Sequence, residues 1–308
     1  MRIMIDIGHP AHVHYFKNFI KIMEEKGAII KVIARDRYPV FELLEHYNIE
    51  YINRGKGRNS VIGKILYMLK ADLLMYRISM KFKPDILLNF GAVYLSQTSK
   101  LIGKPSIIID DTDHATMNHK MYTPFASTIL TPICFEKDFG IKHSRFDGYM
   151  ELCYLHPNYF TPDPRVLDML GVEKGEKYII MRFVSWNASH DVGHSGLSLE
   201  MKRKVVKELS IHSKVFISSE GELPDDLKKY RILIPPEKMH DVLFYATLYL
   251  GESITMSTES TLLGTPSIVV SSLPEMGVPR DIEKYRMTWW YKKWSDNIYE
   301  IIKKIFNT

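Results

Sequence analysis

The opening stretch Arg2-Ile3-Met4-Ile5-Asp6-Ile7-Gly8-His9-Pro10-Ala11-His12-Val13-His14 decides the fold. Residues 2–7 are mostly apolar, are rich in β-branched side chains and stop at Gly8, which predicts a buried strand. Residues 13–26 then repeat apolar side chains at helical spacing up to Gly27, which predicts a helix. The chain therefore begins with a strand, a loop and a helix, the unit from which parallel sheets are built.

The same alternation continues through the first half of the chain. Helical spacing over 38–47, 61–82 and 95–102 alternates with short apolar runs at 29–34, 50–52, 85–89 and 106–109. This rhythm predicts a parallel sheet covered by helices on both faces. Ligands are then expected beyond the carboxyl ends of its strands.

A second alternation follows a proline-containing stretch at 158–164, which is typical of a linker. Strands are expected there at 178–183, 214–218, 232–234, 248–251 and 267–270, and helices at 199–210, 225–230, 240–246 and 258–263. For 308 residues this predicts an α/β protein of two domains, 1–160 and 165–285, followed by a terminal segment, 286–308.

Composition narrows the class of protein. Hydrophobic residues make up 45% and charged residues 25%, and 41 basic residues stand against 36 acidic ones without a long run of either sign. This distribution argues against a nucleic-acid binder but suits an anionic small substrate or acidic lipid head groups. Cys134 and Cys153 form no disulfide framework, and no apolar run approaches the ~20 residues of a membrane span. We expect a cytoplasmic protein, with attachment to the inner membrane surface left open.

The first loop places His9, His12 and His14 just beyond the first strand. Imidazole titrates near neutrality, so such a group can accept a proton from a hydroxyl or bind a phosphate. A zinc site with aspartates of the 110–113 loop is one alternative, although the spacing lacks the regularity of such sites, and we expect no metal. Packing of His14 between helix and sheet is another.

The strongest functional pattern is Gly251-Glu252-Ser253-Ile254-Thr255-Met256-Ser257-Thr258-Glu259-Ser260, followed by the turn at 264–266. A strand leads into small hydroxylated residues where a helix starts, which is typical of a phosphate site. Glu259 could accept hydrogen bonds from a ribose diol, or it could simply cap the helix.

At this pattern and at the Gly8 to His14 loop, the chain resembles the GT-B sugar-nucleotide enzymes. It is similar to the lipid-linked N-acetylglucosaminyltransferase of peptidoglycan synthesis and to the non-hydrolysing UDP-N-acetylglucosamine 2-epimerases. It resembles most a largely archaeal family known only as a domain of unknown function. The resemblance extends over nearly the whole chain and implies two Rossmann-like, doubly wound domains facing a cleft, with the C-terminal helix crossing back to the first domain.

The resemblance also implies roles for single residues. Glu259 matches the glutamate that holds the nucleotide ribose, and Ser257 and Thr258 fall where the family binds diphosphate. His12 matches the histidine that closes the first loop of the transferase, although Pro10 and Ala11 stand where that loop has glycines. The acceptor-side acid of the family falls at Asp110 or Asp111, for which a solvated loop is the alternative.

Further donor ligands are expected around the second sheet. The stretch Arg182-Phe183-Val184-Ser185-Trp186-Asn187 ends a strand where the epimerases carry a His-Arg pair, and Arg182 could clamp a diphosphate or form an interdomain salt bridge. Ser219 ends the next strand. Met239 and His240 lie where relatives hold the base.

The tail is rich in aromatic and aliphatic residues. Trp289, Trp290 and Trp294 precede a helix over 296–306, and burying each ring removes ~150–250 Å² from water. By the resemblance, the helical stripe of that segment docks against the first domain with the tryptophans near the hinge: Ile298, Ile301, Ile302 and Ile305. The alternative is that these side chains complete the core of the second domain.

Together these features predict a glycosyltransferase that moves a sugar from a UDP-linked donor to a hydroxyl of a glycan or lipid-linked acceptor. His12 or an aspartate of the 110–113 loop would remove the acceptor proton, and no cofactor is expected. A UDP-N-acetylglucosamine 2-epimerase and a non-catalytic nucleotide-sugar binder are the alternatives.

Overall fold

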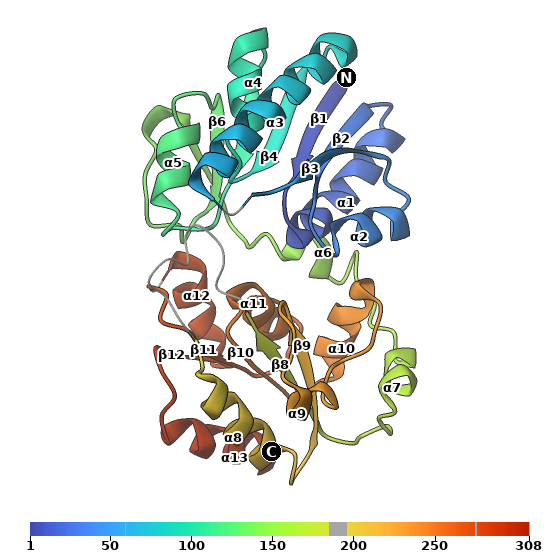
Figure 1. Ribbon diagram of the computed structural model, residues 1–308, viewed down its shortest axis with the longest axis vertical. Helices are drawn as coiled ribbons and strands as arrows, with labels where there is room; N and C mark the ends of the chain where they lie inside the picture. The colour runs from blue at the N-terminus through green and yellow to red at the C-terminus, as the bar shows by residue number, and fades with distance from the viewer. Residues whose placement is uncertain (59, 185–195, 275, 308) are drawn as a thin grey trace. The chain divides into compact units, whose positions relative to one another are not determined.

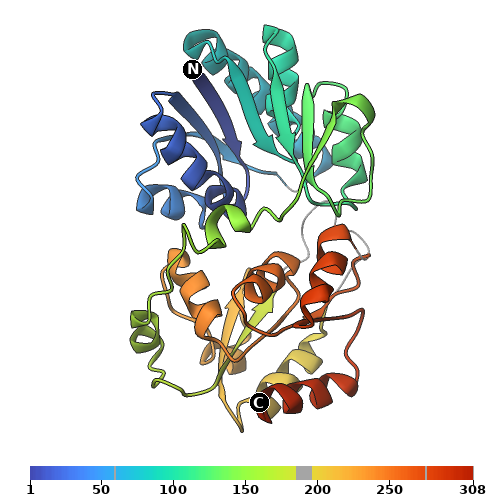
Figure 2. The same ribbon diagram turned by 180° about the vertical axis from the view of Figure 1, so that it is seen from behind.

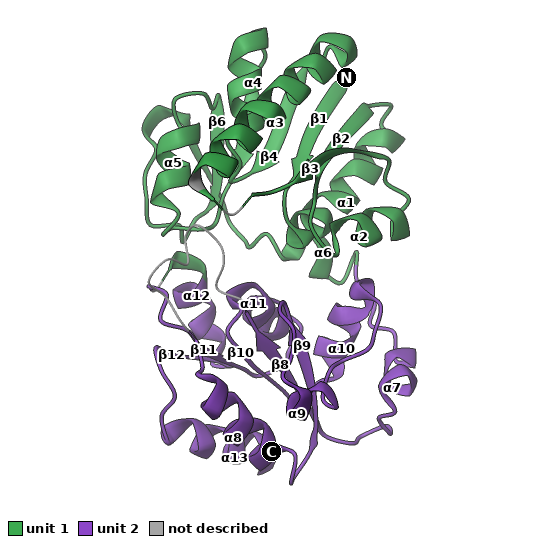
Figure 3. Cartoon of the chain, viewed as in Figure 1, with its two compact units in different colours: residues 1–159, 276–278 green, residues 160–275, 279–308 purple. Residues whose placement is uncertain are grey.

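The computed structural model describes residues 1–58, 60–184, 196–274 and 276–307 (Figure 1). It divides into two compact units (Figure 3): unit 1 is Met1–Tyr159 with Met276–Val278, and unit 2 is Phe160–Glu275 with Pro279–Thr308. The first boundary falls inside the proline-containing stretch at 158–164.

Unit 1 holds a seven-stranded parallel sheet of order β3-β2-β1-β4-β5-β6-β7. Its strands are β1 (Arg2–Ile7), β2 (Ile29–Asp36), β3 (Tyr51–Lys56), β4 (Ile86–Phe90), β5 (Ser106–Ile109), β6 (Thr128–Pro132) and β7 (His143–Phe146). Its helices are α1 (Pro10–Glu25), α2 (Val40–His46), α3 (Val61–Phe82), α4 (Tyr94–Ile102), α5 (Thr116–Tyr122) and α6 (Leu152–Leu155), with a 3₁₀ turn at Gly140–Lys142. The strand order reverses between β1 and β4.

The helices of unit 1 cover both faces of its sheet. Met4, Ile33 and Leu87 pack against α3 and α4, whereas α1 and α2 lie on the opposite face (Figures 1 and 2). A parallel sheet must be covered in this way because both of its faces are apolar. The carboxyl ends of the strands are the edge at which open sheets of this kind bind ligands.

Unit 2 holds a five-stranded parallel sheet of order β12-β11-β10-β8-β9. Its strands are β8 (Tyr178–Phe183), β9 (Lys214–Ser219), β10 (Leu248–Gly251), β11 (Ser267–Val270) and β12 (Thr288–Tyr291). Its helices are α7 (Arg165–Leu170), α8 (Leu199–Leu209), α9 (Asp225–Lys228), α10 (Met239–Tyr245), α11 (Ile254–Leu262), α12 (Gly277–Ile282) and α13 (Asn297–Asn307), with 3₁₀ turns at Pro236–Lys238 and Glu283–Tyr285. The first two residues of α12 belong to unit 1. The strand order reverses between β8 and β10.

Side chains alternate across this second sheet as well. Ile179 and Met181 face a core formed with α8 and α13, while Tyr178 and Ile180 face a core formed with α7, α10 and α11. The prediction of two Rossmann-like α/β domains is therefore confirmed.

The predicted crossing of the C-terminal helix to the first domain is wrong. Residues 279–308 belong to unit 2, and Ile298 and Ile302 of α13 are buried in the core of that unit. Trp289 lies on β12, which pairs with β11 and extends the second sheet. The terminal apolar stripe, Trp289 and Trp294 complete the core of unit 2, because the added strand gives α13 a surface to cover.

The strand predicted at 232–234 is also wrong. Arg231 makes only an isolated bridge to Ile217, and Ile232 donates one backbone hydrogen bond to Ile217. Pro235 and Pro236 follow at once, and proline cannot continue a ladder because it lacks the amide donor.

Candidate functional site

The first loop of unit 1 is organised by the start of α1. This helix begins at Pro10, and the Nδ1 atom of His9 accepts a hydrogen bond from the amide of Ala11 at 3.2 Å. His9 therefore caps the helix. Its ring lies 5.9 Å from that of His12, so two of the three histidines expected in this loop are neighbours.

His12 lies where the strand order of unit 1 reverses. Its ring centroid is 5.0 Å from that of Phe90, the last residue of β4, and its Nδ1 accepts the amide hydrogen of Gly8 at 3.2 Å. Ligands of open α/β sheets bind at such a reversal, so the position of His12 agrees with a role in a site.

The protonation of His12 favours a hydrogen-bond donor over a base. Burial, together with the positive charges of Arg54 and Arg37, lowers the pKa of His12 to about 3. The imidazole is then neutral, and because Nδ1 accepts from Gly8, Nε2 carries the proton. His12 therefore presents an N–H group rather than a lone pair.

His14 takes the packing role. It is buried between two aromatic rings, with its ring centroid 5.9 Å from Tyr47 and 5.2 Å from Tyr154. These rings belong to the region around α2 and α6, so the structure does not bring His14 to the strand ends with His12.

A buried ion pair supports the first loop from beneath. The Nε of Arg54 on β3 donates to Oδ1 of Asp6 on β1 at 2.9 Å, and both side chains are almost fully buried. Burial raises the pKa of Asp6, while the charge of Arg54 opposes that shift. A Cβ placed on Gly8 would lie 3.2 Å from the Arg54 guanidinium, so the loop rests directly on this pair.

Sequence reasoning missed the Asp6–Arg54 pair. It ended the third strand at residue 52, whereas β3 continues to Lys56 and carries Arg54 into the sheet. The available signal was Asp6 itself, since an unpaired carboxylate is costly inside an otherwise apolar strand.

Further cations gather around the ends of β2 and β3. Arg35 lies near the end of β2 and Arg37 directly follows that strand. Lys56 ends β3, and Arg58 lies two residues beyond it. A Cβ on Gly57 would come within 2.0 Å of the Arg35 guanidinium, so the glycine admits the arginine at this edge. Asp36 is the acid that lies between the two arginines in sequence.

The two aspartates that the sequence left undecided have different surroundings. Asp110 is buried after β5 and accepts hydrogen bonds from the Tyr122 hydroxyl at 2.8 Å and the Thr112 amide at 2.9 Å, with His119 Nε2 at 3.4 Å. A Cβ on Gly91, directly after β4, would lie 3.6 Å from its carboxylate. Asp110 is held as a structural group.

Asp111 is partly exposed and accepts a hydrogen bond from the Thr112 hydroxyl at 3.1 Å. Burial of the carboxylate and the negative charge of Asp110 raise the pKa of Asp111 to about 7. A carboxyl group that titrates near neutrality is suited to proton transfer. Of the two aspartates, Asp111 is therefore the candidate acid or base.

Asp113 has a different task. Its Oδ1 accepts from the amide of Glu136, and its Oδ2 accepts from the amide of Gly277, both at 2.8 Å. Met276 Sδ lies 2.9 Å from Nδ1 of His114 beside it. This carboxylate fastens the segment 276–278 into unit 1.

In unit 2, Glu252 anchors the strand ends at the reversal between β8 and β10. It is buried and accepts hydrogen bonds from the amides of Val184 and Leu197, both at 2.7 Å, and from Lys202. Residues 185–187 of the expected Arg182 stretch, Ser185, Trp186 and Asn187, lie outside the described residues. The sequence singled out the pattern that contains Glu252 but gave this residue no role.

Arg182 is paired within its own unit. Its guanidinium donates to the Ser218 hydroxyl at 2.7 Å and to Glu220 at 2.9 Å. Ser219 ends β9 beside them and is partly exposed. Arg182 and Ser219 therefore lie together at the carboxyl edge. The interdomain salt bridge, which was the alternative to a diphosphate role for Arg182, is not the pair described here, because Glu220 belongs to unit 2.

The helix after β10 starts earlier than predicted. α11 begins at Ile254, and the Ser253 side chain caps it by accepting from the Met256 amide at 3.4 Å. The Ser257 hydroxyl is buried against that of Ser267 on β11, and Thr258 is buried too. The first-turn amides are consequently those of Ile254 and Thr255, and the expected diphosphate roles of Ser257 and Thr258 are not favoured by their placement.

Glu259 is joined to His240. The Nε2 of His240 on α10 lies 3.1 Å from Oε1 of Glu259 on α11, and both side chains are buried. Because Ser253 caps α11 and Glu259 lies beyond the first turn, the capping alternative for Glu259 is wrong. His240 and Glu259, two donor-site residues that were predicted separately, are thus brought into contact. The side chain of Met239 packs on the core of unit 2.

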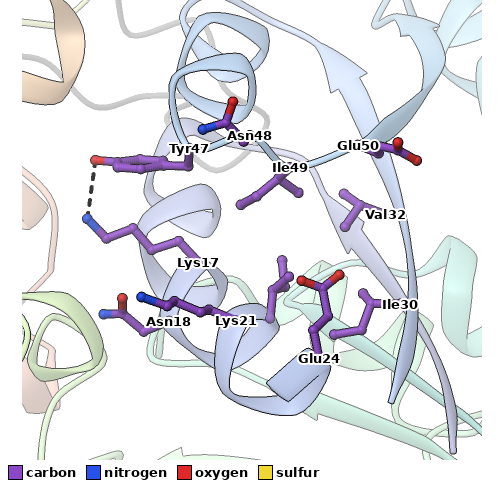
Figure 4. Close-up of a pocket in the computed structure, with 11 residues that line it drawn as sticks. Lys17, Asn18, Lys21, Glu24, Ile30, Val32, Tyr47, Asn48, Ile49 and Glu50 are labelled. Carbon is purple, nitrogen blue, oxygen red and sulfur yellow. Dashed lines mark hydrogen bonds between the residues drawn. The ribbon is translucent and has the colours of Figure 1, made fainter. Parts of the chain in front are cut away.

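Two further observations bear on the site. Within the described ranges, no three His, Cys, Asp or Glu side chains form a group that could hold a metal ion. A pocket of about 460 Å³ is lined by α1, β2 and the turn before β3, where Lys17 donates to the Tyr47 hydroxyl at 3.2 Å (Figure 4). None of the predicted site residues lines it.

Comparison with known proteins identifies the family and the fold of this chain. The family described as "Protein of unknown function (DUF354)" matches residues 1–307. The uncharacterized protein MJ0665 of Methanocaldococcus jannaschii is 26% identical over 296 residues, which cover 92% of this chain and 86% of that protein.

Solved structures are similar over the whole fold. The MnaA protein of S. aureus with UDP has a TM-score of 0.71 at 12% identity, covering 100% of this chain and 88% of that one. The UDP-GlcNAc 2-epimerase of Methanocaldococcus jannaschii, in complex with UDP-GlcNAc and UDP, gives 0.68 at 14%, covering 100% and 92%. The kitacinnamycin glycotransferase gives 0.58 at 10%, covering 94% and 85%. These likenesses show the GT-B fold.

Proposed function

This chain belongs to the DUF354 family, and from that premise we propose that it is a glycosyltransferase that moves a sugar from a UDP-linked donor to a hydroxyl acceptor. The observation that carries the proposal is Asp111. It is a partly exposed carboxyl group at the carboxyl edge of the unit 1 sheet, with a pKa of about 7. A general base is most effective when its pKa lies near the working pH.

Unit 2 supplies the groups for the donor. The Glu259 carboxylate, oriented by His240, accepts hydrogen bonds from the ribose hydroxyls. The first-turn amides of Ile254 and Thr255 bind the diphosphate, because the start of a helix carries unpaired N–H groups and a partial positive charge. Arg182 adds a guanidinium at the same edge.

The proposed reaction uses these groups as follows. Asp111 removes the proton from the acceptor hydroxyl, the oxygen forms a bond to the anomeric carbon, and the bond from that carbon to the UDP oxygen breaks. The pair of electrons leaves with UDP, whose charge the α11 amides and Arg182 stabilise. His12 donates a hydrogen bond from Nε2 and holds the acceptor. UDP-sugar is the substrate, and the step uses no cofactor.

The acceptor is expected to carry negative charge. Arg35, Arg37, Lys56 and Arg58 gather at the ends of β2 and β3. Arginine forks match phosphate oxygens, so a phosphate-bearing glycan or lipid-linked acceptor suits this edge.

A 2-epimerase is the second candidate, favoured by the higher TM-scores of the epimerase structures. Such an enzyme eliminates UDP and adds it back, and it needs acid and base groups at the sugar ring. Residue 181, which precedes Arg182, is methionine, so the His-Arg pair expected of the epimerases is missing at this position.

Product analysis distinguishes these functions. The chain is incubated with UDP-N-acetylglucosamine, with and without a polyprenyl-phosphate acceptor, and UDP release and sugar products are followed by NMR. The proposal expects acceptor-dependent UDP release and a new glycoside, lost in Asp111→Asn and kept in Asp147→Asn, a substitution at an exposed acid of unit 1. A 2-epimer without a glycoside would favour the epimerase, and binding without any product would favour a binding protein.

A further inference from the structure

Helix α3 of unit 1 exposes an unusually long row of large apolar side chains. Seven of them are between about one third and three quarters exposed, and they occur along almost the full length of the helix. The exposed fractions are Ile62 73%, Ile65 50%, Leu66 62%, Leu69 58%, Leu73 49%, Tyr76 37% and Met80 54%.

The spacing places these residues on a single face. Positions three and four apart share one side of a helix, so this row forms a continuous stripe ~27 Å long. The opposite side of α3 is already used, because Tyr67, Ala71, Met75 and Phe82 are buried toward unit 1. The helix cannot turn its apolar stripe inward without giving up that packing.

Such a stripe requires an explanation. Single exposed apolar residues are normal on a protein surface, whereas contiguous apolar patches mark binding surfaces. Helix α4 lies beside α3 (Figure 1). The side chains of the stripe nevertheless remain exposed.

The charges around the stripe identify what it binds. Four basic side chains of α3 are exposed, and Lys70, Arg77 and Lys81 form a row along one border of the stripe. Lys64 and Lys83 add charge at the two ends. Asp72 is the one acid within Val61–Phe82, and its carboxyl group is partly buried.

We propose that α3 docks unit 1 on an anionic lipid bilayer, with its axis in the membrane plane and its apolar stripe among the acyl chains. Amphipathic helices with a basic border bind interfaces in this way, and each Lys or Arg near the surface strengthens binding to acidic lipids. The helix lies on the bilayer and does not cross it: within the described residues, no helix is long and apolar enough to span.

A second copy of the chain fits the same surface less well. In a symmetric antiparallel pair of α3 helices, the row of Lys70, Arg77 and Lys81 would lie beside the same row of the other copy. The other border of the stripe offers only Asp72 as a counter-charge. Anionic head groups compensate the row directly.

Vesicle sedimentation tests the proposal with the full chain. Phosphatidylcholine vesicles with and without phosphatidylglycerol are compared at ~0.1 M salt, where charges interact over ~10 Å. We expect binding to the acidic vesicles, and a loss of at least tenfold in Leu69→Glu/Leu73→Glu. The matched control, Ile141→Glu/Leu233→Glu, alters two exposed apolar residues elsewhere and should bind as the wild type does.

The basic row is tested separately. Lys70→Glu/Arg77→Glu should weaken binding to acidic vesicles about tenfold or more, while Lys204→Glu/Lys207→Glu, on the exposed side of α8, should have a smaller effect. Equal binding to neutral and acidic vesicles, or no binding to either, would overturn the proposal. Light scattering supplies the remaining outcome: a dimer that Leu69→Glu/Leu73→Glu dissociates, without vesicle binding by the wild type, would assign the stripe to self-association instead.

Discussion

The imidazole Nε2 of His240 lies 3.1 Å from the Oε1 of Glu259, and both side chains are buried in unit 2. The two residues come from different helices, α10 and α11. The carboxylate of Glu259 is therefore held by a partner that is itself fixed by packing, with Phe160 edge-on to the imidazole at 6.4 Å.

For this pair we expect coupled effects on donor binding. Glu259→Ala should lower the affinity for UDP by one to two orders of magnitude, about 1.5–3 kcal/mol for hydrogen bonds to a charged group. His240→Ala should cost less, and the double variant should lose less than the two single losses together, because the pair acts as a unit. Calorimetry measures all three affinities, with Glu222→Ala as an exposed control. Unchanged UDP binding in Glu259→Ala would contradict the ribose assignment.

Asp111 gives a prediction that does not depend on activity. Its pKa is about 7 in the folded chain, against an ordinary 3.8, so the folded chain binds more protons than the unfolded chain between these values. The contribution of Asp111 to the free energy of unfolding therefore falls as the pH rises through that window. Asp111→Asn should raise the melting temperature at pH ~8, and the gain should vanish toward pH ~4.

The control for Asp111 is Asp147→Asn, an exposed acid of the same unit. It should leave the pH dependence of melting as in the wild type. A gain in Asp111→Asn of equal size at both pH values would show that charge is not its cause.

His12 should not titrate in the physiological range. With its pKa lowered to about 3, its ring stays neutral between pH ~5 and ~8, with the proton on Nε2. Imidazole NMR shifts test this directly. If the proposed donor role holds, His12→Gln should keep more turnover than His12→Ala, since the glutamine amide can still donate. A titration midpoint near 6.5 would instead restore His12 as a candidate base.

The fold was largely predictable, because long periodic segments left little choice. The limits of α3 match those expected, and the strands over 2–7, 178–183, 248–251 and 267–270 have the expected bounds. Strands of four residues were predicted where their sequence is apolar, as at 248–251 and 267–270, but β6, β7 and β12 were missed because their pairing is decided by neighbouring strands rather than by local pattern.

The site was predictable only in part. The sequence predicted five of the candidate site residues from their residue type and their position near strand ends or helix starts: His12, Asp111, Arg182, His240 and Glu259. Which groups act depends on surroundings that are remote in sequence: the charge of Arg54, 42 positions from His12, and the hydrogen bond from Tyr122 to Asp110. The prediction that α13 crosses to the first domain was wrong for the same reason, since the sequence did not reveal β12 as the strand that α13 covers.

Gly277 offers a stability prediction. A Cβ at this position would lie 1.9 Å from the carbonyl oxygen of Cys134, a distance that requires the backbone to move. Gly277→Ala should therefore destabilise the protein by about 1–3 kcal/mol in denaturant melts. Gly221→Ala, where nothing lies within 4 Å, should be nearly neutral. Equal stability of the two variants would mean that the segment 276–278 is not fastened as described.

That segment also sets the order in which the protein can be completed during synthesis. Because unit 1 contains residues 1–159 and 276–278, its chain is interrupted by the larger part of unit 2. A nascent chain that has emerged as far as residue 159 still lacks the Gly277 amide that Asp113 binds. Domains usually finish folding in the order in which they leave the ribosome. Here unit 1 stays incomplete until residues 276–278 have emerged, so a ribosome that stalls within β11 leaves both units unfinished.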